Sequence, residues 1–233
     1  MINYILIKYI LIPKQAKNIR LGGKFNMKER KKMNNLALKQ EIEQKYSYAD
    51  LLNFPENERY EIIDGNLYLM SAPTVIHQGI LGELYRQISN YLLGKKCKVF
   101  SSPIDVKLSG KKDDKKEFNV VQPDLLIVCD ESKIQKNCIL GAPDFIVEIL
   151  SPSTSSMDRV KKFNLYQKFG VKEYWIVAPE EKNISVFLLN KEGIYTIPKA
   201  YYLTDKVPVN IVKGLNIDLN IYCKENEELL VEK

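Results

Sequence analysis

The sequence predicts an α/β (α+β) fold in which helices flank a mixed β-sheet, and three observations support this class. Asp64-Gly65 separates two short apolar segments, a pattern typical of a β-hairpin. Residues 78–93 carry apolar side chains at helical spacing. An apolar segment at 144–150 is followed by a helical pattern and another apolar segment, as in a strand–helix–strand unit.

Each element is predicted from local periodicity and from the residues that begin or end it. Ser47 can cap the first helix, and Gly94 can end the second. The predicted helices are 47–52, 78–93 and 154–169. The predicted strands are 59–63, 66–70, 98–100, 104–108, 118–121, 125–129, 144–150 and 173–177, and 184–189 and 194–197 form a closing hairpin. Residues 71–77 are predicted to be a loop and 110–117 a charged hairpin tip, and the tail after residue 220 is polar and either helical or frayed.

The charge distribution divides the chain into two parts. The sequence has 35 Lys and Arg against 29 Asp and Glu, a net charge of +6, but residues 1–32 hold nine of the basic residues and Glu29 as their one acid. We therefore expect 1–32 to be a basic N-terminal extension and 33–233 to be a single domain of net charge −2. The extension is either a genuine basic arm or an untranslated segment preceding a start at Met27 or Met33.

Composition excludes several classes of protein. With 45% hydrophobic and 27% charged residues, the chain is neither disordered, collagenous nor a coiled coil. No apolar run approaches the roughly 20 residues needed to cross a bilayer. Residues 2–12 are interrupted by Lys8 and lack a signal-peptidase cleavage motif. We expect a cytoplasmic protein without a membrane partner.

The cysteines offer no zinc site and no disulfide framework. They form no Cys-x-x-Cys pair, and His77 is the only histidine of the chain. Reduced thiols are therefore expected at all four positions, which are Cys97, Cys129, Cys138 and Cys223.

Two carboxylates occupy positions where apolar residues are expected. Glu148 shares a strand face with Ile146 and Leu150 within the apolar segment 144–150. An isolated buried carboxylate is costly, so Glu148 either reaches water from an edge strand or has a function. Asp124 follows Pro123 at the start of another apolar strand, where it either forms a turn or converges with Glu148.

A lysine lies on the apolar face of the predicted helix 154–169. Lys162 precedes Leu165, Tyr166 and Phe169 at helical spacing, and Asp158 lies one turn earlier. This lysine either faces the sheet or extends past its edge into water.

Two other residues have weaker patterns. Glu61 shares a face with Ile63 in the first hairpin strand and, taken alone, reads as an exposed residue. His77, in a loop before a helix, could be a surface group or a catalytic one.

Converging carboxylates beside a lysine suit metal-assisted hydrolysis. Asp124 and Glu148 offer hard oxygen ligands for Mg²⁺, with the backbone carbonyl of Ile149 as a further ligand. Lys162 would orient the attacking water or stabilise negative charge on phosphoryl oxygens.

Several segments of the sequence resemble the Uma-type restriction endonuclease family of the PD-(D/E)XK nuclease superfamily. The resemblance runs from about residue 46 to about 189. It rests on Tyr60 to Gly65 (YEIIDG), Met70 to Pro73 (MSAP), His77-Gln78, Gln122-Pro123-Asp124, Gly141 to Thr154 (GAPDFIVEILSPST), Asp158-Arg159, Lys162, Tyr166 and Gly170 to Val177 (GVKEYWIV).

The resemblance implies a restriction-endonuclease-like αβββαβ core with extra N-terminal and C-terminal hairpins, Mg²⁺ dependence (Mn²⁺ can substitute) and a DNA substrate. Asp124 and Glu148 match the acidic residues of the motif. Leu150 stands where the motif has lysine, and Lys162 matches the lysine that the family supplies from the following helix. Glu61 matches an early glutamate implied to assist metal binding. Four further motif positions are candidates of lower rank: His77, Gln122, Asp158 and Tyr166.

We therefore predict a metal-dependent endonuclease with DNA as its partner and a homodimer if both strands of a duplex are cut. Its catalytic residues would be Glu61, Asp124, Glu148 and Lys162. One alternative is a catalytically silent nuclease-fold module of a mobile element that binds DNA or protein. Another is a metal-dependent phosphodiesterase that acts on RNA.

Overall fold

A six-stranded mixed sheet forms the centre of the structure, a computed structural model. Its strand order is β11-β10-β9-β8-β6-β3; β8 and β9 are parallel, and the other neighbours are antiparallel. The predicted mixed sheet is confirmed. Its strands are β3 (Lys98–Ser101), β6 (Leu125–Val128), β8 (Phe145–Ile149), β9 (Glu173–Ala178), β10 (Asn183–Leu188) and β11 (Lys199–Tyr202).

The structure describes residues 45–55, 57–151, 157–226, 228 and 230, which belong to one compact unit. The predicted basic extension at 1–32 and the alternative starts at Met27 and Met33 lie outside these residues. Within the described residues, no helix combines the length and the apolar character needed to cross a membrane.

A second, five-stranded sheet has the order β2-β1-β5-β4-β7, with β4 and β7 parallel. The Asp64-Gly65 hairpin is confirmed, since Ile63 pairs with Asn66 and both turn residues have positive φ, 48° and 81°. The elements of this region are α3 (Tyr48–Leu51), β1 (Tyr60–Ile63), β2 (Asn66–Leu69), β4 (Asp105–Lys107), η2 (Asp114–Lys116), β5 (Val120–Val121), η3 (Glu131–Lys133) and β7 (Cys138–Leu140).

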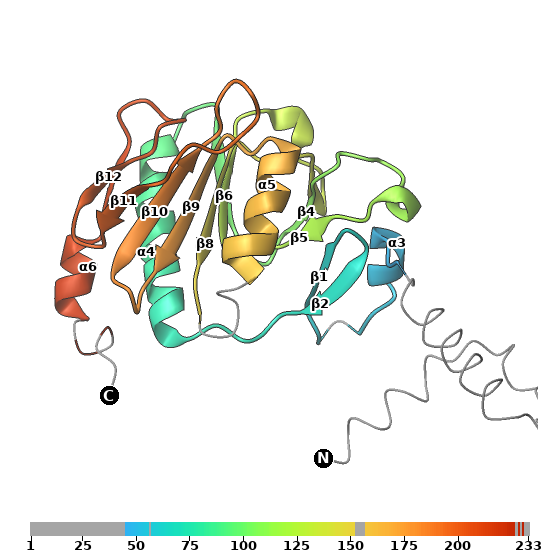
Figure 1. Ribbon diagram of the computed structural model, residues 1–233, viewed down its shortest axis with the longest axis horizontal. Coiled ribbons are helices and arrows are strands. Elements are labelled where there is room, and N and C mark those ends of the chain that lie inside the picture. Colours follow the sequence, from blue (N-terminus) through green and yellow to red (C-terminus); the bar gives the residue numbers. More distant parts are fainter. Residues whose placement is uncertain (1–44, 56, 152–156, 227, 229, 231–233) are drawn as a thin grey trace, which may run out of the picture. The chain divides into compact units, whose positions relative to one another are not determined.

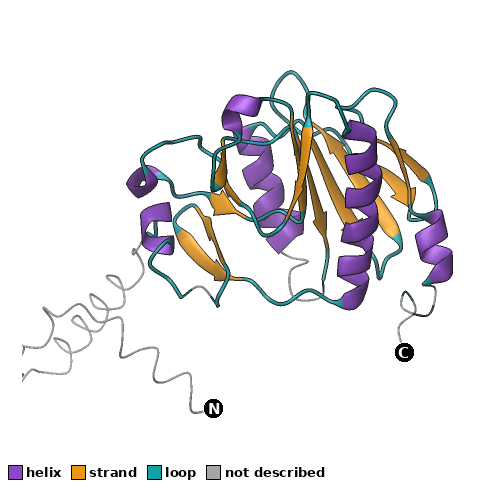
Figure 2. Cartoon of the chain, turned by 180° about the vertical axis from the view of Figure 1, so that it is seen from behind, coloured by secondary structure: helices purple, strands orange, loops and turns teal. Residues whose placement is uncertain are grey.

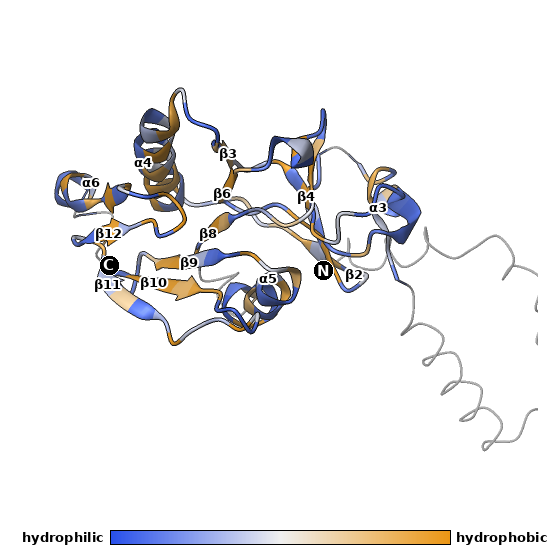
Figure 3. Cartoon of the chain, turned by 90° about the horizontal axis from the view of Figure 1, so that it is seen from above, coloured by the Kyte–Doolittle hydropathy of each residue, from blue (hydrophilic) through white to orange (hydrophobic). Residues whose placement is uncertain are grey.

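Two helices cover opposite faces of the six-stranded sheet. Figure 3 shows α4 (Val75–Leu92) and α5 (Phe163–Phe169) on the two sides of β8 and β9. Figure 1 shows α5 in front of the sheet, and the view from behind in Figure 2 shows α4 on the other face. Phe145, Val147 and Ile149 pack in the core beneath α4, whereas Ile146 and Leu150 pack in the core with α5.

The long helix begins earlier than predicted. Residues 75–77, predicted to be a loop, form the first turn of α4, and the Thr74 side chain accepts a hydrogen bond from the backbone N–H of His77. An N-cap of this kind satisfies a helix N–H that has no partner within the helix. The cap therefore fixes His77 inside the helix.

The third predicted helix, 154–169, is not a single α-helix. Met157–Lys162 (η4) form a π-helical turn before α5, and Gly170 ends α5 in the left-handed conformation at φ 80°. Residues 152–156 lie outside the described residues. π-Helical turns are rare and occur often at functional sites.

The C-terminal hairpin uses a different strand from the one predicted. β10 pairs with β11 rather than with 194–197, from which Tyr195 contributes an isolated bridge to Leu189. The prediction was wrong because the chain runs on through a turn before it pairs. Three short strands were missed, β7, β12 (Lys206–Pro208) and β13 (Asn216–Asp218), and the predicted tail begins as helix α6 (Asn220–Glu225).

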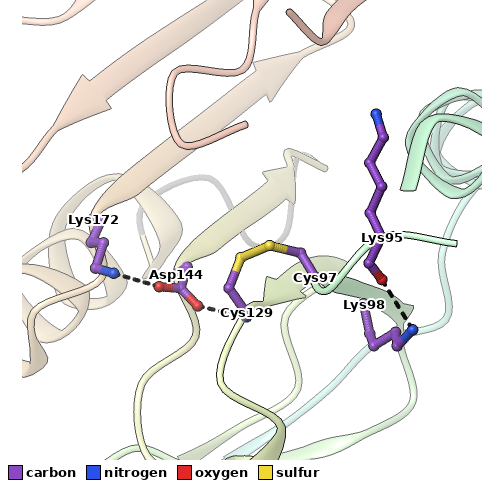
Figure 4. Close-up of a disulfide and its surroundings, with 6 residues drawn as sticks. All are labelled: Lys95, Cys97, Lys98, Cys129, Asp144 and Lys172. Carbon is purple, nitrogen blue, oxygen red and sulfur yellow. Dashed lines mark hydrogen bonds and ion pairs between the residues drawn. A yellow bond between two sulfur atoms is a disulfide. The ribbon is translucent and has the colours of Figure 1, made fainter. Parts of the chain in front are cut away.

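A disulfide contradicts the prediction of four reduced thiols. Cys97 and Cys129 are joined with a Cα–Cα distance of 4.0 Å (Figure 4). They flank β3 and β6, in which Lys98 pairs with Val128, so the register places the two cysteines opposite each other. The sequence contained no signal for this pairing because 32 positions separate the two residues. The free cysteines of the described residues are Cys138 and Cys223.

Candidate active site

Asp124 and Glu148 lie opposite each other on neighbouring strands. Leu125 pairs with Val147 in the antiparallel β6–β8 ladder, so the next position in the same register brings Asp124 beside Glu148. Opposed residues of an antiparallel pair project from the same face of the sheet. The predicted convergence of the two carboxylates is therefore seen in the structure. Because β8 is an inner strand, the reading of Glu148 as a water-exposed edge residue was wrong.

Lys162 lies among three carboxylates. Its Nζ is 2.9 Å from Glu61 Oε1, 3.1 Å from Glu148 Oε1 and 3.5 Å from Asp158 Oδ1, and all four side chains are at most 5% exposed. Lys162 thus faces the sheet and does not extend past its edge into water, which were the two alternatives that the sequence left open. The π-helical turn brings both Asp158 and Lys162 to this face.

Burial shifts the proton equilibria of this cluster. Burial raises the pKa of Glu148 well above its usual 4.5; Lys162 opposes this shift, whereas Asp158, Asp124 and Glu61 increase it. Burial alone would lower the pKa of Lys162, but Glu148, Glu61 and Asp158 raise it well above 10.5. The ammonium therefore stays charged, and Glu148 takes up a proton more readily than an exposed glutamate.

Tyr166 makes a second contact with the central glutamate. Its hydroxyl donates a 2.5 Å hydrogen bond to Glu148 Oε1, the same oxygen that accepts from Lys162. Burial and the neighbouring Glu148 raise the pKa of Tyr166 well above 10. Tyr166 therefore remains a neutral donor that orients the glutamate.

Asp124 has two partners on its Oδ2 atom. The backbone N–H of Ile149 donates to it at 2.7 Å, and His77 Nε2 lies 3.0 Å away. His77 is 7% exposed in the first turn of α4, so its predicted place in a loop was wrong, and of its two interpretations the surface group is excluded. Its buried Nδ1 has no hydrogen-bond partner among the described residues.

Glu61 is buried, contrary to its reading as an exposed strand residue. Besides Lys162, its Oε1 accepts a 2.8 Å hydrogen bond from the backbone N–H of Gln122. The Gln122 side chain faces elsewhere: its Nε2 donates to Asp105 at 2.9 Å, and its Oε1 accepts from Arg59 Nε at 2.9 Å. Glu61 was misread because its partners come from segments distant in the sequence.

These residues surround one cavity of about 180 Å³. It lies between the end of the first hairpin, the start of α4 and the π-helical turn. The predicted residues that line it are Glu61, His77, Asp124, Glu148, Ile149, Asp158 and Lys162, and Arg59 also lines it. Gln122 and Tyr166 do not line the cavity but hold residues that do. Sequence reasoning missed Arg59, although strand alternation places it on the same side as Glu61, two residues later.

The donor set suits a divalent cation bound partly through water. Four cavity carboxylates outnumber the Lys162 ammonium and the Arg59 guanidinium, which leaves an excess of negative charge. Within the described residues, Glu148 Oε2, Glu61 Oε2 and Asp124 Oδ1 accept no hydrogen bond. No three His, Cys, Asp or Glu of that part of the chain form a complete metal site. One or two carboxylates are the usual protein contribution to a Mg²⁺ site, so the residues fit this ion.

Comparisons with known proteins identify the family and a related fold. The profile of the Uma2 family, described as "Putative restriction endonuclease", matches residues 45–220. Uncharacterized protein slr1290 of Synechocystis sp. is 26% identical over 167 residues, 71% of this chain and 84% of that protein. A crystal structure of a "putative nuclease belonging to DUF820" from Anabaena variabilis shares the fold, with a TM-score of 0.60 and 20% identity over 80% of this chain and 99% of the other. The chain belongs to the Uma2 family.

Proposed function

We propose that this protein is a metal-dependent endonuclease that hydrolyses DNA phosphodiester bonds. The observation that carries the proposal is the pairing of Asp124 with Glu148 across β6 and β8, with Lys162 Nζ 3.1 Å from Glu148. The two carboxylates can act as ligands of a metal ion, and the lysine ammonium can stabilise the negative charge of a phosphate in the same cavity.

Asp124 and Glu148 would hold Mg²⁺, with the Ile149 carbonyl as a further ligand; Mn²⁺ can substitute. When bound, the ion supplies charge stabilisation for the phosphodiester and a water of lowered pKa. Ile149 N–H and His77 hold Asp124 in position, and Tyr166 does the same for Glu148. Ordered ligands of this kind reduce the reorganisation needed for reaction.

Lys162 would act on the phosphate side of the site. Its ammonium stays protonated because of Glu148, Glu61 and Asp158. A fixed positive charge at this position stabilises the negative charge that develops on the phosphoryl oxygens and orients the attacking water. Glu61 assists by holding the lysine and by adding a carboxylate to the metal environment.

Cleavage of plasmid DNA tests this proposal. We expect nicking or linearisation that requires Mg²⁺ or Mn²⁺, and its loss in Glu148→Ala and Lys162→Ala proteins that keep the wild-type circular dichroism spectrum. Single-stranded, branched and modified DNA, as well as RNA, should be tried with the same protein. The absence of wild-type cleavage on every DNA substrate would contradict the proposal, and cleavage of RNA alone would move it to a ribonuclease.

A non-cleaving DNA- or protein-binding module is the second candidate, and one observation favours it. Lys162 is already engaged by three carboxylates, as expected of a lysine with a structural role. Calorimetry separates the two candidates: Mg²⁺ or Mn²⁺ binding that disappears in Asp124→Asn supports the nuclease, and no metal affinity supports the silent module.

A further inference from the structure

Arg59 is a cation in the candidate active site to which the mechanism above gives no task. It immediately precedes β1, and its backbone carbonyl accepts a hydrogen bond from Met70, which extends the hairpin by one pair. Arg59 lines the same cavity as Asp124, Glu148 and Lys162. This backbone hydrogen bond fixes the position from which the Arg59 side chain extends.

The guanidinium of Arg59 forms no ion pair with an acidic side chain in the part of the chain that the structure describes. No Asp or Glu of the described residues lies within ion-pair distance of it, although four carboxylates line the same cavity. Its buried Nη2 atom also makes no hydrogen bond to any of the described residues. A buried donor without a partner is costly, and a guanidinium offers five N–H groups, so this arrangement is incomplete without an acceptor.

A chain of hydrogen bonds holds Arg59 in this unpaired state. Asp105 accepts from the Tyr48 hydroxyl and from Gln122 Nε2, each at 2.9 Å. Because the carboxylate can only accept, Gln122 must present its amide oxygen to the other side, where Arg59 Nε donates to it at 2.9 Å. Gln122 therefore aligns the guanidinium through a neutral amide oxygen, which provides no formal negative charge to pair with Arg59.

We propose that Arg59 binds a phosphodiester oxygen of the DNA substrate, with Gln122 and Asp105 as its positioning residues. The inference rests on the proposed function and names a substrate-binding group of that same site. A guanidinium forms paired hydrogen bonds with phosphate oxygens, and Arg59 Nη2 has no hydrogen-bond partner among the described residues. The phosphate would supply the acceptor that Arg59 Nη2 lacks among the described residues.

Salt-dependent DNA binding tests this assignment in the full chain. The Glu148→Gln background prevents cleavage, and a labelled duplex is titrated at several salt concentrations without divalent ions and with Mg²⁺. We expect Arg59→Met to weaken binding by about ten- to a hundredfold, because a charged hydrogen bond is lost. It should also reduce the slope of log affinity against log salt by about 0.9, the value for one phosphate contact.

Arg86→Met is the matched control, because it removes the same charge from an exposed arginine that is paired with Glu83 and does not line the cavity. Its slope should stay within error of the background protein. Arg59→Lys keeps the charge but not the paired donors, so we expect an intermediate affinity with an unchanged slope. Gln122→Met should likewise weaken binding and leave the slope unchanged, since it removes orientation only.

Two results would overturn the assignment of Arg59 while leaving the proposed nuclease intact. One is equal affinity and equal slope in Arg59→Met and Arg86→Met. The other is weaker binding by Arg59→Met with an unchanged slope, which indicates a structural role. If the wild-type protein neither binds nor cleaves DNA under any of these conditions, the proposed function and this inference fail together.

Discussion

The two faces of strand β8 are built in opposite ways. Phe145, Val147 and Ile149 face α4 and pack in a cluster of apolar side chains, whereas Glu148 on the other face meets Lys162 within the α5-side core. The first face stabilises the fold by removing apolar surface from water. The second accepts a cluster of buried charges, which contribute little stability or even reduce it. One strand thus separates the residues that stabilise the protein from those proposed to react.

Neighbouring positions on β8 should therefore give opposite phenotypes, and this is the largest expected effect. Glu148→Ala should reduce metal-dependent cleavage by about 100- to 1000-fold, the loss seen when a group that stabilises the transition state is removed. Val147→Ala should keep cleavage within a few-fold but lower the free energy of unfolding by about 2–3 kcal/mol. Cleavage rates and urea unfolding of both variants make the comparison. A large loss of cleavage in a well-folded Val147→Ala protein would contradict it.

Removing the cation from the charged face should destabilise the protein without opening a large cavity. Lys162→Met leaves Glu61, Glu148 and Asp158 buried without their shared partner, and we expect the free energy of unfolding to fall by about 3–5 kcal/mol at neutral pH. The loss should shrink as the pH is lowered and the carboxylates gain protons. Urea unfolding at several pH values measures it. A pH-independent loss would point to packing rather than charge.

The disulfide belongs to the apolar side, because Cys97 and Cys129 both pack against the core beneath α4. Closing a loop of this length stabilises a fold by about 2–4 kcal/mol. Reduction, or the Cys97→Ser/Cys129→Ser double variant, should lower the free energy of unfolding by that amount and leave the cleavage rate unchanged. Cys138→Ser, which alters a free thiol, is the control for thiol chemistry. A loss of activity on reduction would show that the two faces are coupled.

The smallest expected effect is a pH dependence of metal binding. Because the pKa of Glu148 is raised above 4.5 in the metal-free protein, the metal must displace a proton at low pH. Metal affinity should therefore increase with pH, by at most tenfold per pH unit, and level off above that pKa. The same shift means that the free energy of unfolding of the metal-free protein falls as pH rises through the raised pKa.

Titration calorimetry with Mg²⁺ or Mn²⁺ at a series of pH values measures this dependence. Glu148→Gln, which cannot lose a proton at this position, should bind metal weakly and without the same dependence. An affinity of the wild type that stays flat with pH would indicate that Glu148 is already ionised before the metal arrives.

Local patterns in the sequence predicted elements but not their grouping. The Asp64-Gly65 hairpin and the central strand–helix–strand unit follow from turn chemistry and periodicity, and both are present. In contrast, β3 and β4 are consecutive in the chain yet belong to different sheets. Strands as short as β7 and β12 carry too few residues for alternation to be recognised.

The same division applies to the candidate site. Glu148 and Lys162 stood out because each is charged within an apolar pattern, and that mismatch is visible in sequence. Glu61 and His77 were not separable from surface residues, since their burial depends on Gln122 and Asp124 from distant segments. Arg59 does not interrupt an apolar pattern, so the sequence gives no reason to select it. It stands out only in the structure, where its buried Nη2 has no hydrogen-bond acceptor among the described residues.

The register between β6 and β8 also limits how this site can vary among related chains. Leu125 opposite Val147 brings Asp124 and Glu148 to one face, and a slip of one residue would send them to opposite faces while the strands remained paired. Insertions between residues 129 and 143 can lengthen the connection without changing this alignment. A single deletion inside either strand would shift this register and separate the two acids, so the length of both strands between the pair and the turn is fixed by the site.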